Sequence, residues 1–380
     1  MLNNKLIYLT YQNFPANTAN SLQTITNVVE LTRQGIDVTL IFPDRMCNSS
    51  DDINLLKKYY GFDVNFKVFK LEHKLPFEKF KLFKRVNYHV LHIIWAIKAV
   101  KYLNSAYNAM TVMTRSDWVF LLLSLKKTNV IFEVHQTSKI RRWILKKASK
   151  KNSSKVIFLT EDLKNYYRSI FKSQLNSIVL QNGYNQNLFE DTPIKTSNEV
   201  IFIGELKRFN ESRDIEFIIK CFNNNLLKDY NLKIVGGPNE YSEELSKKYN
   251  ITNQGNIKIY GRLNHVEAVS LLKSSSIGLL VNKNSNQHSI RFTSPLKYFE
   301  YLAAEVKIVG VNFPAHRQLP YSENIIFYEE NDEKSFINAI LKSSDVSPIN
   351  KNLYSKFSIR SRVKDIIEFA RLEGLEPPTL

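Results

Sequence analysis

The sequence predicts an α/β fold made of two tandem doubly wound domains. Short runs of β-branched and aromatic residues alternate with longer helical segments along the 380 residues, a pattern typical of parallel sheets covered by helices. The length suggests two or three domains, at about 100–200 residues per domain. A polar stretch without periodicity, Glu190–Glu199, divides the alternation into two halves of similar size.

The first domain is expected over residues 1–192. A strand at Lys5–Tyr11, a helix at Asn20–Arg33 and a strand at Val38–Phe42 form a Rossmann-like unit with parallel pairing. The same alternation continues with strands at 109–113, 130–134, 155–159 and 177–180, and with helices at 86–103, 118–125 and 161–171. One doubly wound sheet accommodates all of these strands.

The second domain is expected over residues 198–350. Its predicted strands are 200–204, 230–235, 257–260, 277–281 and 307–311, and its predicted helices are 214–222, 242–249, 265–274 and 296–304. Ligands of open doubly wound sheets bind beyond the carboxyl ends of the strands. We therefore expect the functional site in a cleft between two facing domains.

Composition places the chain among globular proteins of a reducing compartment. A hydrophobic content of 43%, with 24 Phe and 19 Tyr, excludes wholesale disorder. Cys47 and Cys221 are too few and too far apart for a disulfide framework or a cysteine-rich zinc site. The N-terminus lacks the features of a signal peptide, and no apolar run reaches about 18 residues. We expect a cytoplasmic protein that does not span a membrane.

Strand exits of the first domain carry three candidate groups. The loop around Asn17 opens a helix, and its backbone N–H groups suit an anion or a sugar, although helix capping is the commoner role of such loops. His135 ends an apolar strand that also holds Glu133 and is a candidate general base or hydrogen-bonding group; a satisfied core or surface histidine is the alternative. Arg115 follows another strand, where a solvated surface cation is the alternative.

The second domain offers groups that suit a nucleotide. Gly204 is followed by three cations, Lys207, Arg208 and Arg213, which suit a diphosphate leaving group; a basic surface loop is the alternative. Gly236 lies in a tight turn after a strand. The helix start at Thr293, Ser294 and Leu296 suits a phosphate, and Glu300 suits the hydroxyls of a ribose.

Taken in order, these segments resemble the nucleotide-sugar-dependent glycosyltransferases of family four, which have the two-domain fold called GT-B. The resemblance covers nearly the whole chain, and the segments that carry it include VIFEVH, VIFIGELKRFNESRDIEFII, LKIVGGPNE and SPLKYFEYLAAEVKIVG. Each segment alone is a loose match, whereas their order and spacing together are specific. It implies transfer of a glycosyl group from a nucleoside diphosphate sugar, with retention of configuration. It also implies that a helix at about 355–372 packs back on the first domain. The chain contains no Asp-x-Asp motif, which agrees with a reaction that needs no metal ion and no cofactor.

The resemblance also implies roles for individual residues. His135 would face the donor sugar, and Arg213 would match the basic residue of the second-domain loop; these two are the catalytic candidates. Glu300 would bind the ribose, Thr293–Leu296 would lie along the diphosphate, and the loop Ala16–Asn20 would close over the reacting centre. The donor-binding candidates are thus Asn17, Gly204, Lys207, Arg208, Gly236, Thr293, Ser294, Leu296 and Glu300.

Four positions depart from the family pattern. Phe292 stands where the family commonly has a second glutamate, eight residues before the ribose-binding one, so recognition of the sugar hydroxyls must differ or be lost. Glu205 stands where many members have arginine after the strand glycine. Glu305 and Lys307 replace the usual glycine and proline after the ribose-binding helix.

The net charge of +17 is concentrated in the first domain. Residues 67–101 carry a net +7 and residues 139–155 a net +8, and both stretches interleave cations with aromatic and aliphatic residues. A basic surface with apolar side chains suits anionic lipid. A solvated basic face and a nucleic-acid surface are the alternatives; since no nucleic-acid motif occurs, no nucleic-acid partner is expected.

These observations predict a glycosyltransferase that extends a lipid-linked glycan at the cytoplasmic face of the plasma membrane. The donor would be a nucleoside diphosphate sugar, and the setting would be assembly of a bacterial cell-surface polysaccharide such as lipopolysaccharide. One alternative is a nucleotide-sugar epimerase on the same fold. The other is a catalytically inactive binding protein, which Phe292 and Glu205 motivate.

Overall fold

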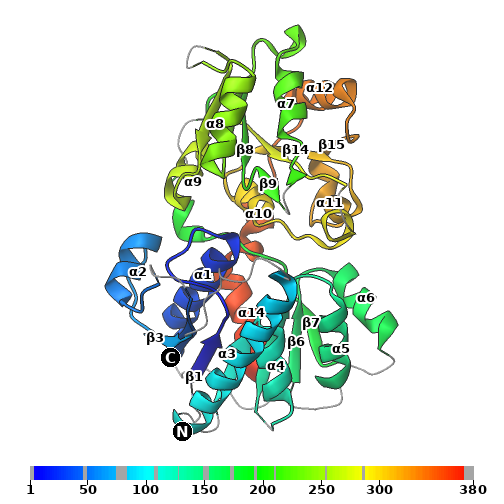
Figure 1. The fold of residues 1–380 in the computed structure, drawn as a ribbon. Coiled ribbons are helices and arrows are strands. Elements are labelled where there is room, and N and C mark those ends of the chain that lie inside the picture. The colour runs from blue at the N-terminus through cyan, green and yellow to red at the C-terminus, as the bar shows by residue number, and fades with distance from the viewer. Residues whose placement is uncertain are drawn as a thin grey trace. The chain divides into compact units, whose positions relative to one another are not determined.

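The computed structural model describes residues 4–45, 49–73, 84–106, 110–126, 128–148, 154–171, 175–191, 195–208, 211–252, 255–284 and 287–371. The chain divides into two compact units (Figure 1). Unit 1 comprises Met1–Gln181 and Ile359–Leu380, and unit 2 comprises Asn182–Ser358. Each unit holds a parallel sheet covered by helices, which confirms the predicted α/β class with two Rossmann-like sheets.

The sheet of unit 1 has the strand order β3-β2-β1-β4-β5-β6-β7, and neighbouring strands run parallel. Its strands are β1 (Lys5–Leu9), β2 (Asp37–Asp44), β3 (Lys67–Glu72), β4 (Thr111–Thr114), β5 (Val130–Val134), β6 (Ser154–Phe158) and β7 (Ser177–Val179). Strands β5 and β6 are buried at every residue, as expected where helices cover both faces. The carboxyl ends of the strands therefore share one edge of the sheet.

The helices of unit 1 are α1 (Ala19–Arg33), α2 (Ile53–Tyr60), α3 (Lys84–Ala106), α4 (Asp117–Ser124), α5 (Lys139–Ala148), α6 (Glu161–Ile170) and α14 (Ile359–Arg371). Thr18, Ser116 and Thr160 cap α1, α4 and α6 by accepting backbone N–H groups. Right-handed crossovers place α1 and α2 on one face of the sheet and α3 to α6 on the other. Helix α14 packs beside α1 (Figure 1).

Helix α14 belongs to the core of unit 1 although it comes from the end of the chain. Its buried residues Ile359, Val363, Ile366 and Ile367 join the apolar cluster formed by α1 and β2, and burial of each such side chain contributes about 1.5–3 kcal/mol. The buried Lys155 on β6 donates to the carbonyl oxygens of Phe369 (2.8 Å) and Ala370 (3.1 Å). The last turn of α14 is thereby held to the sheet.

The sheet of unit 2 has the parallel strand order β12-β11-β8-β13-β14-β15. Its strands are β8 (Glu199–Ile203), β11 (Asn231–Val235), β12 (Ile257–Gly261), β13 (Ile277–Leu280), β14 (Lys307–Val311) and β15 (Ile325–Tyr328), and a short antiparallel pair joins β9 (Lys207–Arg208) and β10 (Glu211–Ser212). Its helices are α7 (Ile215–Phe222), α8 (Asn239–Lys248), α9 (His265–Lys273), α10 (Leu296–Ala303), α11 (Pro314–Arg317), α12 (Glu333–Lys342) and α13 (Lys351–Tyr354).

The division between the units lies before the linker that the sequence predicts at Glu190–Glu199. Tyr184 forms a bridge with Ser358, and its backbone N–H donates to the carbonyl oxygen of Phe357 (3.1 Å). Tyr184 and Phe189 are buried in the core of unit 2. The chain from Asn182 onward thus already packs with unit 2, because two aromatic residues there need an apolar partner.

Candidate functional site

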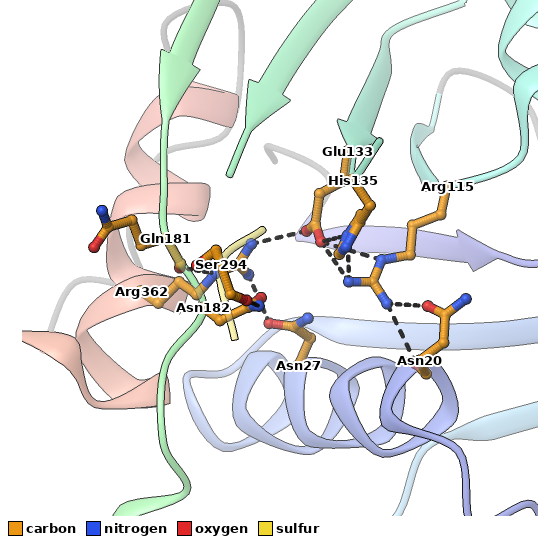
Figure 2. A network of polar contacts seen from close by, with 9 residues as sticks. All are labelled: Asn20, Asn27, Arg115, Glu133, His135, Gln181, Asn182, Ser294 and Arg362. Atoms are coloured by element: carbon orange, nitrogen blue, oxygen red, sulfur yellow. Dashed lines mark hydrogen bonds and ion pairs between the residues drawn. The ribbon is translucent and has the colours of Figure 1, made fainter. Parts of the chain in front are cut away.

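Unit 1 gathers buried polar side chains at the carboxyl edge of its sheet (Figure 2). Arg115 follows β4, Glu133 lies in β5 and His135 follows β5. The side chains of Arg115 and Glu133 are buried, whereas that of His135 is 27% exposed. Arg115 is therefore not the solvated surface cation of the alternative interpretation.

Two guanidinium groups bind the carboxylate of Glu133 from opposite sides. Arg115 donates from Nε (3.1 Å) and Nη2 (2.6 Å) to Oε1, and Arg362 on α14 donates from Nη2 to Oε2 (2.9 Å). His135 Nε2 contacts the same Oε1 and Arg115 Nη2. Arg115 also donates to the backbone oxygen (3.2 Å) and side-chain oxygen of Asn20. Figure 2 shows these groups converging on Glu133.

The charges of this network set the state of both titratable groups. Burial raises the pKa of Glu133, but the charges of Arg115 and Arg362 outweigh it and hold that pKa well below its ordinary value. Burial and the charge of Arg115 lower the pKa of His135 to about 4. At pH 7 the imidazole is neutral and the carboxylate is ionised. Glu133 is thus a buried counter-ion, and His135 is suited to hydrogen bonding rather than to general-base work.

The loop that precedes α1 is fixed by side chains of its own unit. The hydroxyl of Tyr60 accepts from the backbone N–H of Ala16 (2.7 Å) and donates to its carbonyl oxygen (2.9 Å). Thr18 caps α1 by accepting from the N–H of Ser21 (3.1 Å), so helix capping accounts for part of the predicted loop. Asn17 is half-buried between these two anchors.

In unit 2 the loops after β8 and β11 pack backbone against backbone. The N–H of Gly204 donates to the carbonyl oxygen of Val235 (2.9 Å), and that of Leu206 donates to Gly237 (2.8 Å). A Cβ atom at Gly236 would lie 1.8 Å from the carbonyl oxygen of Gly204, so that position accepts only glycine. The loops of Gly204 and Gly236, predicted separately, therefore form one surface at the end of the sheet.

Two cationic side chains meet at Gly204. A Cβ atom there would lie 3.7 Å from Nζ of Lys297 and 3.8 Å from Nη1 of Arg213. Sequence reasoning named Arg213 but not Lys297, although Lys297 lies in the SPLKYFEYLA segment, three residues before Glu300. The two cations suit an anion bound at the exit of β8.

The other charged candidates around Gly204 have different partners. The ammonium of Lys207 lies over the ring of Tyr241 (3.7 Å) and 3.8 Å from Oε2 of Glu244. The side chain of Arg208 lies outside the described residues. Glu205, which departs from the family pattern, accepts from Arg262 Nη2 (2.7 Å). That ion pair neutralises a carboxylate that would otherwise oppose an anionic ligand.

Glu300 is buried in α10, and its Oε1 lies 2.7 Å from Nε2 of His265 at the first position of α9. Burial lowers the pKa of His265, but the charge of Glu300 and the hydrogen bond to it outweigh burial and raise that pKa. This pair was not predicted.

The segment that leads into α10 contains one turn of π-helix, His288–Phe292, and Phe292 is buried. Asn182 Nδ2 donates to the carbonyl oxygen of Ser294 (2.6 Å). Thr293 and Leu296 are half-buried around Ser294, at the start of α10. The helix start named in the sequence is therefore held in place within unit 2.

The described residues contain no group of three or more His, Cys, Asp or Glu side chains placed to hold a metal ion. Within the same ranges, no helix has the length and apolar character needed to cross a membrane.

Several solved structures share the fold of this chain, whereas no curated protein matches it in the comparison of sequences. Sucrose-phosphate synthase from Thermosynechococcus elongatus is 14% identical, with 97% of this chain and 98% of that chain covered and a TM-score of 0.72. Anabaena HepE in complex with UDP and glucose is 11% identical (97% and 99% covered, TM-score 0.63). The lipopolysaccharide outer core galactosyltransferase WaaB is 12% identical (96% and 98% covered, TM-score 0.60). At these identities the likeness shows the fold alone.

The family is indicated by unit 2. Residues 197–345 match the family described as Glycosyl transferases group 1. The matched region contains Gly204 with the two cations that meet there, Arg213 and Lys297, and it also contains Glu300. The resemblance seen in the sequence is confirmed: residues 197–345 match the group 1 glycosyltransferases, which are family four, and the chain as a whole has the GT-B fold of its structural neighbours.

Proposed function

We propose that this glycosyltransferase transfers a sugar from a nucleoside diphosphate donor to a lipid-linked glycan. The reaction proceeds with retention and without a metal ion, as in the family, at the cytoplasmic face of the plasma membrane during assembly of a cell-surface polysaccharide. The observation that carries the proposal is the meeting of Arg213 and Lys297 at Gly204, on a region that matches the family.

Unit 2 binds the nucleotide in this proposal. Arg213 and Lys297 neutralise the diphosphate, whose negative charge grows as the bond to the sugar breaks. Thr293, Ser294 and Leu296 lie along the diphosphate at the start of α10, and Glu300 accepts hydrogen bonds from the ribose. Gly204 and Gly236 allow the backbone to approach the ligand closely. HepE has been solved with UDP-glucose, so uridine nucleotides are the first donors to test.

Unit 1 contributes His135 as a hydrogen-bonding partner of the donor sugar. A pKa near 4 makes its imidazole a weak base at pH 7. The proton of the acceptor hydroxyl then passes to an oxygen of the departing phosphate. The protein stabilises the leaving group and orients the sugar, and it supplies no nucleophile of its own.

The outer surface of unit 1 supports a membrane-bound acceptor. Helix α3 exposes four apolar side chains spaced by three and four residues, which places them on one face: Val86 (59%), Val90 (48%), Ile94 (45%) and Ile97 (41%). The exposed Lys98 and Lys101 extend the same region. An apolar stripe continuous with cations fits the surface of an anionic bilayer.

Helix α5 has the same character. Trp143 is 49% exposed, and the exposed Lys139, Lys146 and Lys147 lie one turn before and after it. Indole rings favour the boundary between lipid and water, and lysines favour anionic headgroups. Residues 74–83 and 149–153 of the predicted basic stretches lie outside the described residues. The proposed docking surface therefore comprises the exposed residues of α3 and α5 named here.

A second candidate function is a nucleotide-binding protein without transferase activity. The buried Phe292 stands where the family commonly has its sugar-binding glutamate, so that position supplies no carboxylate. The sugar then has fewer partners in unit 2, and turnover rather than nucleotide binding separates the two candidates.

Titration calorimetry with UDP, GDP, ADP and TDP tests the nucleotide site. We expect one of them to bind, and Arg213→Met and Lys297→Met each to weaken binding about tenfold or more, because each removes a charged hydrogen bond worth about 1.5–3 kcal/mol. Lys220→Met, which removes an exposed cation from α7 in the same unit, is the matched control. If both variants bind the nucleotide with unchanged affinity, Arg213 and Lys297 do not bind the diphosphate.

A further inference from the structure

We propose that Arg362, carried by the C-terminal helix α14, is a positioning residue that holds His135 in its working orientation through Glu133. The inference rests on the proposed function, in which His135 contacts the donor sugar. Arg362 itself touches no substrate in this account. Its contacts all lie within unit 1, on three segments that are distant in the sequence.

All three nitrogens of the Arg362 guanidinium donate hydrogen bonds within unit 1. Nη2 donates to Oε2 of Glu133 (2.9 Å), Nη1 donates to Oδ1 of Asn27 on α1 (2.9 Å), and Nε donates to the carbonyl oxygen of Gln181 (2.8 Å). Figure 2 shows the guanidinium between Glu133, Asn27 and Gln181. Each of its three nitrogens thus has a different partner, a planar arrangement that lysine cannot reproduce.

Glu133 transmits this geometry to His135. One carboxylate oxygen is held by Arg362, and the other is held by Arg115 and contacts the imidazole. Because the carboxylate is buried, it cannot exchange these partners for water. Without Arg362, Oε2 loses its donor, and Arg115 alone orients the carboxylate that contacts His135.

Helix packing alone does not explain an arginine at this position. The apolar residues Val363, Ile366 and Ile367 and the clamp by Lys155 already fix α14 to unit 1. Burying a guanidinium carries a desolvation penalty, and well-packed apolar side chains in its place are often as stable or more so, so stability alone does not require an arginine here. The charged groups of the buried network are Arg115, Arg362 and Glu133. Two other titratable groups lie near Arg362: Tyr8 on β1, and the exposed Asp365 one turn further along α14.

The charge of Arg362 affects the pKa of His135, a quantity that a purely structural role of Arg362 would leave unchanged. Burial, Arg115 and Arg362 each lower the pKa of His135, which Glu133 raises. Arg362→Gln removes one cation and is expected to raise that pKa, as followed by NMR titration of the imidazole. Arg362→Lys keeps the charge and is expected to leave the pKa near its wild-type value while losing part of the alignment.

The rate of nucleoside diphosphate release from the donor sugar then tests whether Arg362 positions His135. We expect Arg362→Gln to lower release of nucleoside diphosphate from the donor sugar about tenfold or more, as the loss of a charged hydrogen bond of about 1.5–3 kcal/mol implies. Arg362→Lys should recover part of this loss, and binding of the free nucleotide to unit 2 should be unchanged. Arg360→Gln, which removes an exposed arginine two residues earlier on α14 that pairs with Glu30 at 3.7 Å, is the matched control.

A double-mutant cycle decides whether Arg362 acts through His135. If it does, Arg362→Gln costs little further activity in a His135→Ala background. An equal loss in both backgrounds, or an unchanged titration of His135 in Arg362→Gln, would overturn the inference. A wild-type chain that binds no nucleotide would contradict the proposed function instead, and the titration of His135 would still test this inference.

Discussion

Nε2 of His265 lies 2.7 Å from Oε1 of Glu300. A carboxylate accepts hydrogen bonds only, so the imidazole donates and the pair is polarised toward an ion pair. Glu300 is buried in α10, and His265 begins α9. The carboxylate assigned to the ribose is therefore oriented by a neighbouring helix before any ligand binds.

This contact predicts a pH-dependent contribution to stability. The pKa of His265 is raised in the folded chain, so its stabilising effect is complete below the unfolded value of about 6.5 and is lost as the pH rises through the folded value. We expect His265→Gln to lower the melting temperature most at about pH 5.5 and least at about pH 8.5. If His265→Gln lowers the melting temperature by the same amount at every pH in this range, the raised pKa assigned to His265 is wrong.

The same pair predicts an effect on ligand binding. Glu300→Ala removes the proposed acceptor of the ribose hydroxyls, and we expect the dissociation constant for the bound nucleoside diphosphate to rise about 10- to 100-fold, as for loss of hydrogen bonds to a charged group. Glu240→Ala, an exposed carboxylate at the start of α8, is the control. Calorimetry that gives equal affinity for wild type and Glu300→Ala would show that the ribose binds elsewhere.

The exposed stripe of α3 predicts binding to anionic vesicles. We expect the wild-type chain to sediment with phosphatidylglycerol-containing vesicles at low salt, and the bound fraction to fall steeply as salt screens the lysines. Val90→Ser with Ile94→Ser, or Trp143→Ser alone, should reduce binding at every salt concentration because the apolar contribution is lost.

Leu226→Ser is the matched control for this experiment, since Leu226 is an exposed apolar residue of unit 2. Its binding should equal that of wild type. If the wild-type chain stays in solution at low salt, or if Leu226→Ser reduces binding as much as the α3 variant, the docking surface proposed for unit 1 is wrong.

The clamp on α14 predicts a loss of stability. Lys155 donates to the carbonyl oxygens of Phe369 and Ala370, and Lys155→Met leaves both without this donor. We expect the free energy of unfolding to fall by about 1–3 kcal/mol and the C-terminal helix to become more sensitive to limited proteolysis. Lys364→Met, on the exposed face of α14, should change neither measurement.

Much of the fold was predictable because parallel strands carry a strong local signal. Strands β5, β6, β8 and β13 consist mostly of buried apolar residues, with few polar exceptions such as Glu133 and Lys155, and each lies within or against a predicted range. The edge strand β3 was missed because its residues alternate between exposed and half-buried and include lysines. Helix α2, which has one buried residue, was not predicted, and neither were β15 and α12.

The site was less predictable because its contacts join residues far apart in the chain. Strand exits and motif order indicated His135, Arg213 and Glu300, but no local pattern pairs Arg362 with Glu133, 229 positions away. The pairing of His265 with Glu300 likewise depends on how α9 and α10 pack. The expected cleft between the two domains stays a prediction.

Turnover of a nucleoside diphosphate sugar tests the central claim most directly. The chain is incubated with UDP-, GDP-, ADP- and TDP-linked sugars, with and without anionic vesicles that contain polyprenyl-linked glycans, and the released nucleoside diphosphate is measured. We predict release from at least one donor, faster with the glycan-bearing vesicles, and strongly reduced in Glu300→Ala and Arg213→Met. No release from any donor by the folded wild-type chain would contradict the claim that it is an active glycosyltransferase.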